Sequence, residues 1–454
     1  MNFIYVHTHD SGREMQPYGA AANNPGLMRL ARESFMFRNA HCAAPTCSPS
    51  RAAMLSGMTA HESGMLGLAH RGFKMNDYSR HLAPYLSRNG YHTALIGVQH
   101  EARKGALIGY DEDMSDHVAK GKPAEYSDEK SLGLACDFLR RRKSEQKPFF
   151  LSFGLRSTHR VYADTDHDID DFVRPPFPIV DTTETRHDYA NYLRTLETAD
   201  KCVAGLLGEL DALGLREDTA VMFTTDHGLA LPGMKSTLYD TGTGVALMIS
   251  LPGKAHGCTD ALVSHIDVFP TVCDILGVPR PAWIQGKSLL PIMNGEVDEI
   301  NDYVFSEITY HATYEPTRCV RSKTAKLIRY FDTDLSPRFP NIDRSSAKDA
   351  YLTSRLPHKG HIREQLYDLV ADPCERINLV NDPGYADVYA ELSAVLEAHM
   401  KETDDPLLYG QVALADGWVM NRTFDLDPDD PTYNNKGEQA RAFKKTPTAD
   451  TPKS

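Results

Sequence analysis

Ionisable side chains follow four short apolar segments of the sequence, at the point where each segment ends. They are His9 and Asp10 after residues 3–7, His100 after 92–96, His159 after 148–153, and Asp226 with His227 after 220–224. Carboxylates and imidazoles are side chains that bind metal ions and transfer protons. Parallel strands bring their carboxyl ends to one edge of a sheet, which is where open α/β sheets bind ligands. The sequence therefore predicts a ligand site formed by these side chains.

One of the eight cysteines, Cys47, lies in a pattern of its own. No two cysteines form a C-x-x-C pair, which argues against a zinc ribbon or a thioredoxin-like site, and a disulfide framework is not expected in a chain of 454 residues. Most of the cysteines are expected to be small core residues. Cys47 is followed by Pro49 and Arg51 in a C-x-P-x-R pattern. The alternative interpretation is an unmodified thiol at the start of a helix.

The segment 39–57 around Cys47, Pro49 and Arg51 resembles the signature of the formylglycine-dependent (type I) sulfatases of the alkaline-phosphatase superfamily. In that family a separate formylglycine-generating enzyme oxidises the cysteine to an aldehyde, formylglycine. The resemblance implies that Cys47 is the precursor of the nucleophile. One hydroxyl of the hydrated aldehyde accepts the sulfuryl group and the other expels it by collapsing to C=O, whereas a serine would remain as a stable sulfate ester.

The resemblance also implies a divalent metal ion. The segment 225–240 resembles the second metal-binding segment of the family, in which Asp226 and His227 ligate the cation and Lys235 holds the sulfate. A hard cation with carboxylate ligands neutralises a sulfuryl oxygen well. We expect one Ca²⁺, Mn²⁺ or Zn²⁺ ion per subunit, with the modified Cys47 among its ligands.

The end of the first apolar segment departs from the family pattern. The family carries two acidic residues there, and this chain carries His9 and Asp10. Asp10 matches the second position and is expected to be a metal ligand. His9 is expected either to ligate the metal or to form a hydrogen bond beside it. A nitrogen ligand favours Mn²⁺ or Zn²⁺ over Ca²⁺.

Three further residues match positions that bind the sulfate or move protons in the family. The segment 94–100 resembles a Gly-Lys-Trp-His stretch, so His100 is expected to be the base that acts on formylglycine, while Val98 replaces the lysine. His159 matches the histidine that contacts the sulfate and protonates the leaving group. Arg51 is expected to orient and polarise the formylglycine.

The resemblance covers about residues 1–400 and is nearest to the N-sulfoglucosamine sulfohydrolase-like or arylsulfatase branch. Segments 64–71, 314–321 and 365–369 carry it. The His-Asp start and the residues beyond 410 depart from the better-known members of that branch. The natural substrate therefore stays open between an aryl sulfate, a sugar sulfate and a sulfamate.

The elements that position these residues alternate between strand and helix through residues 1–300, which predicts an α/β catalytic domain. Strands are predicted at 3–7, 92–96, 148–153, 220–224 and 245–250, and helices at 79–88, 127–141, 187–213 and 267–276. The strand segments are short and mainly apolar, as expected for strands buried on both faces. The predicted fold is an alkaline-phosphatase-like, mostly parallel sheet sandwiched by helices.

Residues 301–410 are predicted to form a smaller α+β domain, with short strands at 303–308, 318–321, 326–331 and 365–369 and a helix at 385–400. From about residue 411 to residue 454 the chain is polar and rich in Asp, Pro and Lys. That composition predicts either a disordered tail or an arm that contacts a neighbouring subunit of a homo-oligomer.

Composition excludes several classes of partner. The net charge is −13, and no run of Lys and Arg is long enough for a polyanion groove, which argues against nucleic acid and an anionic membrane surface. No segment is apolar for about 18 residues, so a membrane-spanning helix is not expected. No signal peptide is evident, which favours the cytoplasm, or the periplasm if a leader has been removed.

The function expected from the sequence is hydrolysis of sulfate esters or sulfamates, with a small-molecule or saccharide sulfate as substrate. The nearest alternative is a phosphonate monoester or phosphodiester hydrolase of the same superfamily. A second alternative is a non-catalytic binding protein on a degenerate hydrolase scaffold, which is suggested by Val98 and His9 at positions where the family carries lysine and aspartate.

Overall fold

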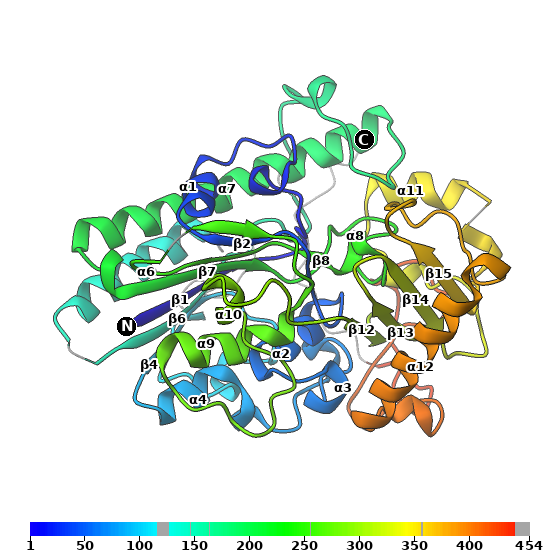
Figure 1. Cartoon of the computed structure of the whole chain (residues 1–454). Helices are drawn as coiled ribbons and strands as arrows, with labels where there is room; N and C mark the ends of the chain where they lie inside the picture. Colours follow the sequence, from blue (N-terminus) through cyan, green and yellow to red (C-terminus); the bar gives the residue numbers. More distant parts are fainter. Residues whose placement is uncertain (116–126, 146, 163, 255, 356, 441–454) are drawn as a thin grey trace.

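The computed structural model describes residues 1–115, 127–145, 147–162, 164–254, 256–355 and 357–440 (Figure 1). An eight-stranded sheet covered by helices lies beside a four-stranded antiparallel sheet with a helix of its own. The predicted fold class, an α/β sheet with a smaller C-terminal α+β unit, is confirmed.

The large sheet has the order β10-β2-β9-β7-β1-β6-β4-β5. Its strands are β10 (Gly257–Thr259), β2 (Phe35–Phe37), β9 (Leu247–Ser250), β7 (Thr219–Thr225), β1 (Asn2–Thr8), β6 (Phe149–Gly154), β4 (His92–Gly97) and β5 (Glu112–Asp113). β9 is antiparallel to both of its neighbours, and the other pairs are parallel. The carboxyl ends of β1, β4, β6 and β7 therefore meet at one edge.

The strand predicted at 245–250 is wrong as a single element. Val245 belongs to β8 (Gly244–Val245), which joins β3 (Ala40–His41) and β11 (Val263–Ser264) in a separate three-stranded sheet, while β9 lies in the large sheet. The chain switches sheets at Ala246, whose backbone N–H donates to Gly12. This contact joins residues that are far apart in sequence, so the local sequence pattern does not predict the change of sheet.

Helices cover both faces of the large sheet, as Figure 1 shows. On one face lie α1 (Pro25–Arg32), α6 (Asp128–Lys143) and α7 (Thr183–Leu213), and on the other α2 (Cys47–Ser56), α4 (Leu82–Arg88) and α9 (Val268–Leu276). Ile4 and Val6 of β1 pack on the first face, and Phe3 and Tyr5 on the second. Successive strand residues point to opposite faces, so a central strand with helices on both sides is apolar throughout.

Among the helices of the large sheet, α4, α6 and α9 begin later than predicted, and α7 begins four residues earlier than predicted, at Thr183. α4 begins at Leu82 because the His81 side chain accepts a hydrogen bond from the Ala83 N–H at 3.1 Å, as a helix cap does. α9 begins at Val268, after a short 3-10 turn over His265–Asp267. The remaining short helices are α3 (Ala60–Ser63), α8 (Asp240–Thr243), α10 (Leu290–Met293) and α11 (Ser346–Thr353).

The smaller sheet consists of β12 (Val304–Tyr310), β13 (Tyr314–Arg321), β14 (Ala325–Tyr330) and β15 (Glu364–Asp368), paired in that order. Helix α12 (Ala386–Glu402) packs on it through Leu392, Leu396 and Met400 against Val320 and Leu327. β13 begins four residues earlier than predicted, and its full length coincides with segment 314–321, which resembled the family.

Residues 411–440 of the polar C-terminal segment pack on the chain itself. The Trp418 ring lies 4.1 Å from the Phe73 ring, centroid to centroid. The Val419 N–H donates to the Arg71 carbonyl, and the Arg71 side chain donates to the carbonyl of Pro428. The rest of this predicted tail, residues 441–454, lies outside the described residues.

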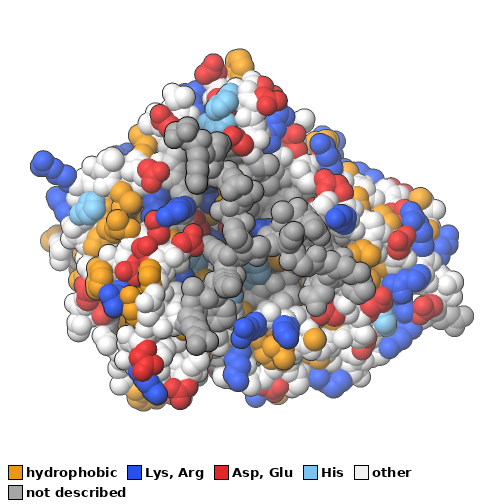
Figure 2. All heavy atoms as spheres, turned by 180° about the vertical axis from the view of Figure 1, so that it is seen from behind, with side chains coloured by type: hydrophobic (Ala, Val, Ile, Leu, Met, Phe, Trp, Pro, Cys, Tyr) orange, Lys and Arg blue, Asp and Glu red, His pale blue; other side chains and the backbone are white. Residues whose placement is uncertain are grey.

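Acidic and basic side chains are interspersed over the face of the molecule that Figure 2 shows, with hydrophobic side chains between them. Within the part of the chain that the structure describes, no helix has the length and apolar character needed to cross a bilayer.

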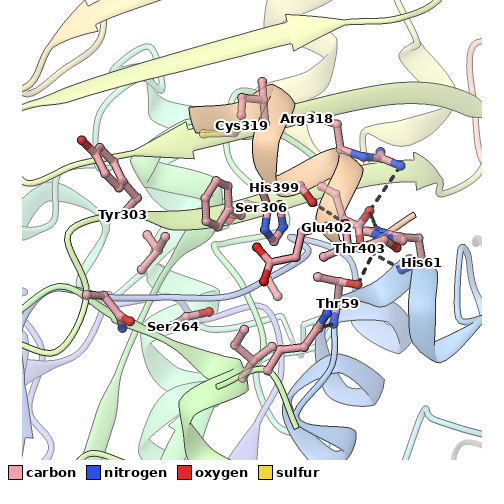
Figure 3. Close-up of a pocket in the computed structure, with 18 of the residues that line it drawn as sticks. Thr59, His61, Ser264, Tyr303, Ser306, Arg318, Cys319, His399, Glu402 and Thr403 are labelled. Atoms are coloured by element: carbon pink, nitrogen blue, oxygen red, sulfur yellow. Dashed lines mark hydrogen bonds and ion pairs between the residues drawn. The ribbon is translucent and has the colours of Figure 1, made fainter. Parts of the chain in front are cut away.

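A cavity of about 460 Å³ lies between the small sheet with α12 and the segments around Thr59, Ser264 and Gln285. Figure 3 shows it between α12, β12 and Thr59, the residue that caps α3. Beside it, His61 Nδ1 lies 2.8 Å from Glu307 Oε2, and Arg318 Nη2 lies 3.3 Å from Glu307 Oε2 and 2.9 Å from Asp405 Oδ1. These four residues, all with side chains at most 7% exposed, form an ionic cluster that joins α3 to the small sheet.

Replacing Arg318 by methionine is expected to lower the free energy of unfolding by about 3–5 kcal/mol, because Glu307 and Asp405 would keep their buried charges and lose a cation. Urea denaturation measures the change. Lys323→Met removes an ion pair with Glu299 in which both side chains are more than a third exposed, so its cost should stay below about 1 kcal/mol. Equal midpoints for Arg318→Met and the wild type would show that the ionic cluster contributes nothing.

Candidate active site

Cys47 is the first residue of α2 and lies beneath the carboxyl edge of the large sheet. Its Sγ lies 3.3 Å from His227 Nε2 and 3.9 Å from Asp10 Oδ1. Burial, together with the charges of Asp10 and Asp226, raises the pKa of the Cys47 thiol well above its ordinary value. The protein groups therefore keep an unmodified thiol neutral, and a neutral thiol is a weak nucleophile.

Four side chains with metal-binding atoms meet at this point. Asp10, Cys47, Asp226 and His227 are all buried, and their ligand atoms lie within 4.8 Å of one another. Asp10 has left-handed backbone geometry (φ 42°), and its N–H donates to Asp226 Oδ1 at 2.9 Å. The end of β1 is thereby fastened to the end of β7.

The donor set fits a divalent cation. His227 Nδ1 lies 3.0 Å from the carbonyl oxygen of Gly228, which assigns the ring proton to Nδ1 and leaves the Nε2 lone pair facing the two carboxylates. His227 Nε2 lies 3.4 Å from Asp10 Oδ1 and 3.6 Å from Asp226 Oδ2. A histidine oriented by a carbonyl through its second nitrogen is the usual arrangement of a metal ligand.

Arg51 lies one helical turn after Cys47 and contacts the metal-binding carboxylate. Its Nη2 donates to Asp226 Oδ2 and to the Thr8 carbonyl, both at 3.0 Å, and its Nη1 contacts His7 Nδ1. Burial alone would raise the pKa of Asp226, but His227 and Arg51 hold it well below its ordinary value. Arg51 therefore keeps Asp226 charged and in place.

Three histidines surround the side of Cys47 away from α2. One ring nitrogen each of His100 and His159 lies within 4.8 Å of Cys47 Sγ. The His9 ring packs beside both, 4.7 Å from the His100 ring and 5.5 Å from the His159 ring, and those two rings are 5.7 Å apart, centroid to centroid. Burial, His159 and Arg51 lower the pKa of His100, so His100 is a neutral base.

His9 lies outside the set of four metal-binding side chains. Its Nδ1 is 3.8 Å from Asp226 Oδ2, and neither ring nitrogen has a hydrogen-bond partner among the described residues. Burial lowers its pKa, so the ring is neutral. A buried imidazole without a hydrogen-bond partner, next to these metal-binding side chains, is positioned to contact either the metal ion or an oxygen atom of the substrate.

Lys235 brings a positive charge to the site. Its Nζ lies 3.2 Å from Asp10 Oδ2 and 2.9 Å from Asp343 Oδ2. Burial alone would lower the pKa of Lys235, but the two carboxylates raise it well above its ordinary value. The amino group is thus held as a cation beside Asp10.

Two residues of this site were not predicted from the sequence. His7 lies on β1 and contacts Arg51 through Nδ1, and a lone histidine within a strand gives no signal. Asp343 lies between β14 and α11, outside any motif, and only the packing of the small sheet brings it to Lys235. The site residues that were predicted from the sequence all lie around Cys47.

Comparison with known proteins gives a consistent result. The sequence matches the family model described as Sulfatase over residues 1–278 and the model described as N-sulphoglucosamine sulphohydrolase, C-terminal, over residues 233–339. N-sulphoglucosamine sulphohydrolase of Homo sapiens is 28% identical, over 89% of this chain and 91% of the relative. Choline-sulfatase of Rhizobium meliloti is 25% identical, over 84% of this chain and 83% of the relative.

Solved structures with the same fold include one described as being in complex with its substrate D-glucosamine-2-N,6-O-disulfate. The superposition has a TM-score of 0.71 at 19% sequence identity, and it covers 89% of this chain and 98% of the chain of the solved structure. At this identity the likeness concerns the fold. The predicted family relationship is confirmed by the family models.

Proposed function

Since the chain belongs to the sulfatase family and is a sulfuric ester hydrolase, we propose that it hydrolyses a sugar O-sulfate or N-sulfate through a formylglycine formed at Cys47 and one divalent cation. The observation that supports this most directly is the position of Cys47 Sγ, buried beside the metal-binding atoms of Asp10, Asp226 and His227. The sulfur marks the place that the oxygen atoms of formylglycine would take.

Asp10, Asp226 and His227 would hold the cation, with the modified residue 47 as a further ligand. When bound, the cation supplies positive charge that draws electron density from the sulfuryl oxygens and favours the hydrated aldehyde. The hydrate offers one hydroxyl to form a bond with sulfur and a second from which the sulfate is later released. Electrostatic stabilisation of this kind carries the largest share of catalysis in such sites.

The histidines and the lysine divide the remaining tasks. Lys235, held as a cation, binds a sulfuryl oxygen and gives up part of its contact with Asp10 to do so. His159 Nδ1 donates to the Arg160 carbonyl at 2.6 Å, so the ring in its doubly protonated form would give its Nε2 proton to the departing oxygen or nitrogen. His100, neutral at the site, takes the proton from the hydroxyl that expels sulfate.

Sugar sulfates and sulfamates are the favoured substrate class because of the relatives. The names of the human relative and of the solved complex both refer to N-sulfated glucosamine. The carboxylate of Asp343 beside Lys235 is an acceptor suited to a sugar hydroxyl or amine next to the sulfate.

The proposal is tested by comparing kcat/KM for 4-nitrophenyl sulfate and glucosamine N-sulfate with kcat/KM for a phenyl phosphonate monoester, on enzyme with converted Cys47. We expect the sulfates to be preferred by on the order of tenfold or more. A strong preference for the phosphonate would identify a phosphonate monoester hydrolase instead. If converted protein that has been supplied with divalent cations binds none of them and turns over no sulfate or phosphonate ester, a binding protein would be favoured.

A further inference from the structure

A second group of metal-binding side chains lies away from Cys47, where the segment after β6 meets the first turns of α7. His167 Nδ1 and His187 Nδ1 lie 2.7 Å and 2.9 Å from the same oxygen, Oδ2 of Asp170. The two imidazole rings are stacked with centroids 3.8 Å apart. Three potential ligand atoms from two separate segments therefore converge on one point.

The other oxygen of the same carboxylate points to a missing ligand. Asp170 is only 7% exposed, and its Oδ1 has no hydrogen-bond partner among the described residues. Buried carboxylate oxygens normally have a partner, because leaving one without a partner costs free energy. A cation bound by this carboxylate, or a water on that cation, would supply the missing contact.

His187 also has the outer contact that metal-binding histidines show. Its Nε2 lies 2.7 Å from Asp164 Oδ1, so the ring can donate its Nε2 proton there and present the Nδ1 lone pair to an ion. A carboxylate on the second nitrogen fixes the ring orientation and raises its basicity as a ligand.

Local charge favours a cation at this place. Five of the eight residues from 164 to 171 are aspartates: Asp164, Asp166, Asp168, Asp170 and Asp171. Arg194 pairs with Asp168, which leaves the segment strongly negative. A divalent ion that takes the place of a proton between an imidazole Nδ1 and Asp170 Oδ2 would make the net charge of this segment less negative.

We infer that His167, His187 and Asp170 form a second metal site, separate from the one at Cys47, that takes a zinc-class transition-metal ion. Two imidazole nitrogens and one carboxylate suit Zn²⁺ better than Ca²⁺, which prefers six or more oxygen ligands. Ligand atoms around tetrahedral zinc lie roughly 3.3 Å apart, so the cluster has to open by a few tenths of an ångström. The His167 side chain is 66% exposed and is free to make this adjustment.

The ion would fasten the segment after β6 to α7. The residue after His187, Asp188, already binds Arg160 Nη1 at 2.7 Å, and the Arg160 carbonyl contacts the His159 ring. His187 of the second site is therefore next in sequence to Asp188, which holds Arg160, and Arg160 in turn contacts His159. Metal binding at this place does not depend on the proposed sulfatase chemistry.

The test is the amount of Zn²⁺ bound by the full-length enzyme after chelator treatment and dialysis against a fixed concentration of free Zn²⁺. His167→Asn is the informative variant, because asparagine tolerates the left-handed backbone of this position (φ 58°) while a ligand is lost. His256→Asn, at an exposed histidine elsewhere, is the matched control.

We expect the wild type and His256→Asn to bind one more equivalent of Zn²⁺ than His167→Asn, whose affinity for that equivalent should fall at least about tenfold. Zn²⁺ should also raise the melting temperature of the wild type more than that of His167→Asn. Circular dichroism without metal checks that the variant is folded. Equal Zn²⁺ content and equal thermal shifts in all three proteins would overturn the inference.

Discussion

Replacing Cys47 by alanine is expected to lower kcat/KM for sulfate esters by on the order of 10⁴-fold or more, because the nucleophile is lost while the cation site remains. Cys47→Ser should behave differently. A serine hydroxyl can form a bond with sulfur but has no second hydroxyl to expel the sulfate. We expect one turnover per enzyme molecule, followed by arrest, with a sulfate ester on residue 47 visible by mass spectrometry.

The control for the Cys47 variants is Cys42→Ala, which removes another buried thiol from the segment that leads to α2. It should cost stability through the space it leaves, and kcat/KM of the folded enzyme should stay within a few-fold of the wild type. If Cys47→Ala kept wild-type activity, residue 47 could not be the nucleophile.

Asp10→Asn is expected to remove the catalytic cation and to lower kcat/KM by on the order of 10³-fold. The substitution keeps the size of the side chain but removes the charge that faces Lys235 Nζ at 3.2 Å, His227 Nε2 at 3.4 Å and Cys47 Sγ at 3.9 Å. Metal analysis and steady-state kinetics on the same preparation measure both effects.

A matched buried carboxylate separates this effect from general destabilisation. Asp200 is 3% exposed and accepts hydrogen bonds from the Gly26 and Leu27 N–H groups at 3.0 and 2.7 Å. It lies on α7, which covers the face of the large sheet opposite to α2. Asp200→Asn should lower the melting temperature and leave metal content and kcat/KM unchanged. Full metal content in Asp10→Asn would show that the ion is held elsewhere.

The main strands and the residues at their ends could be predicted from the sequence. β1, β4, β6 and β7 are continuous apolar runs, and parallel pairing brings the residues that follow them to one edge. Asp10 and Asp226 could therefore be expected at the same edge, and the pairing of β1 with β7 makes them neighbours. Arg51 could be placed beside the same site because it lies four residues after Cys47 on one helix.

The contributions of the small sheet and of sheet switching could not be predicted. Asp343 reaches Lys235 because the small sheet packs against the segment after Lys235, where Arg321 and Lys326 pair with Asp240. This long-range contact has no local pattern. The break at Ala246 has the same origin, since the residues that fix it lie near the end of β1. The acidic segment 164–171 carries no apolar periodicity, and its contact with His187 follows from the fold alone.

The most direct test of the proposed chemistry is peptide mass analysis of residue 47, combined with metal analysis, on protein produced together with a formylglycine-generating enzyme. We expect the peptide to carry the aldehyde in place of the thiol, and the protein to hold a divalent cation that Asp10→Asn loses. An unchanged thiol at position 47 in active protein would contradict the proposed nucleophile.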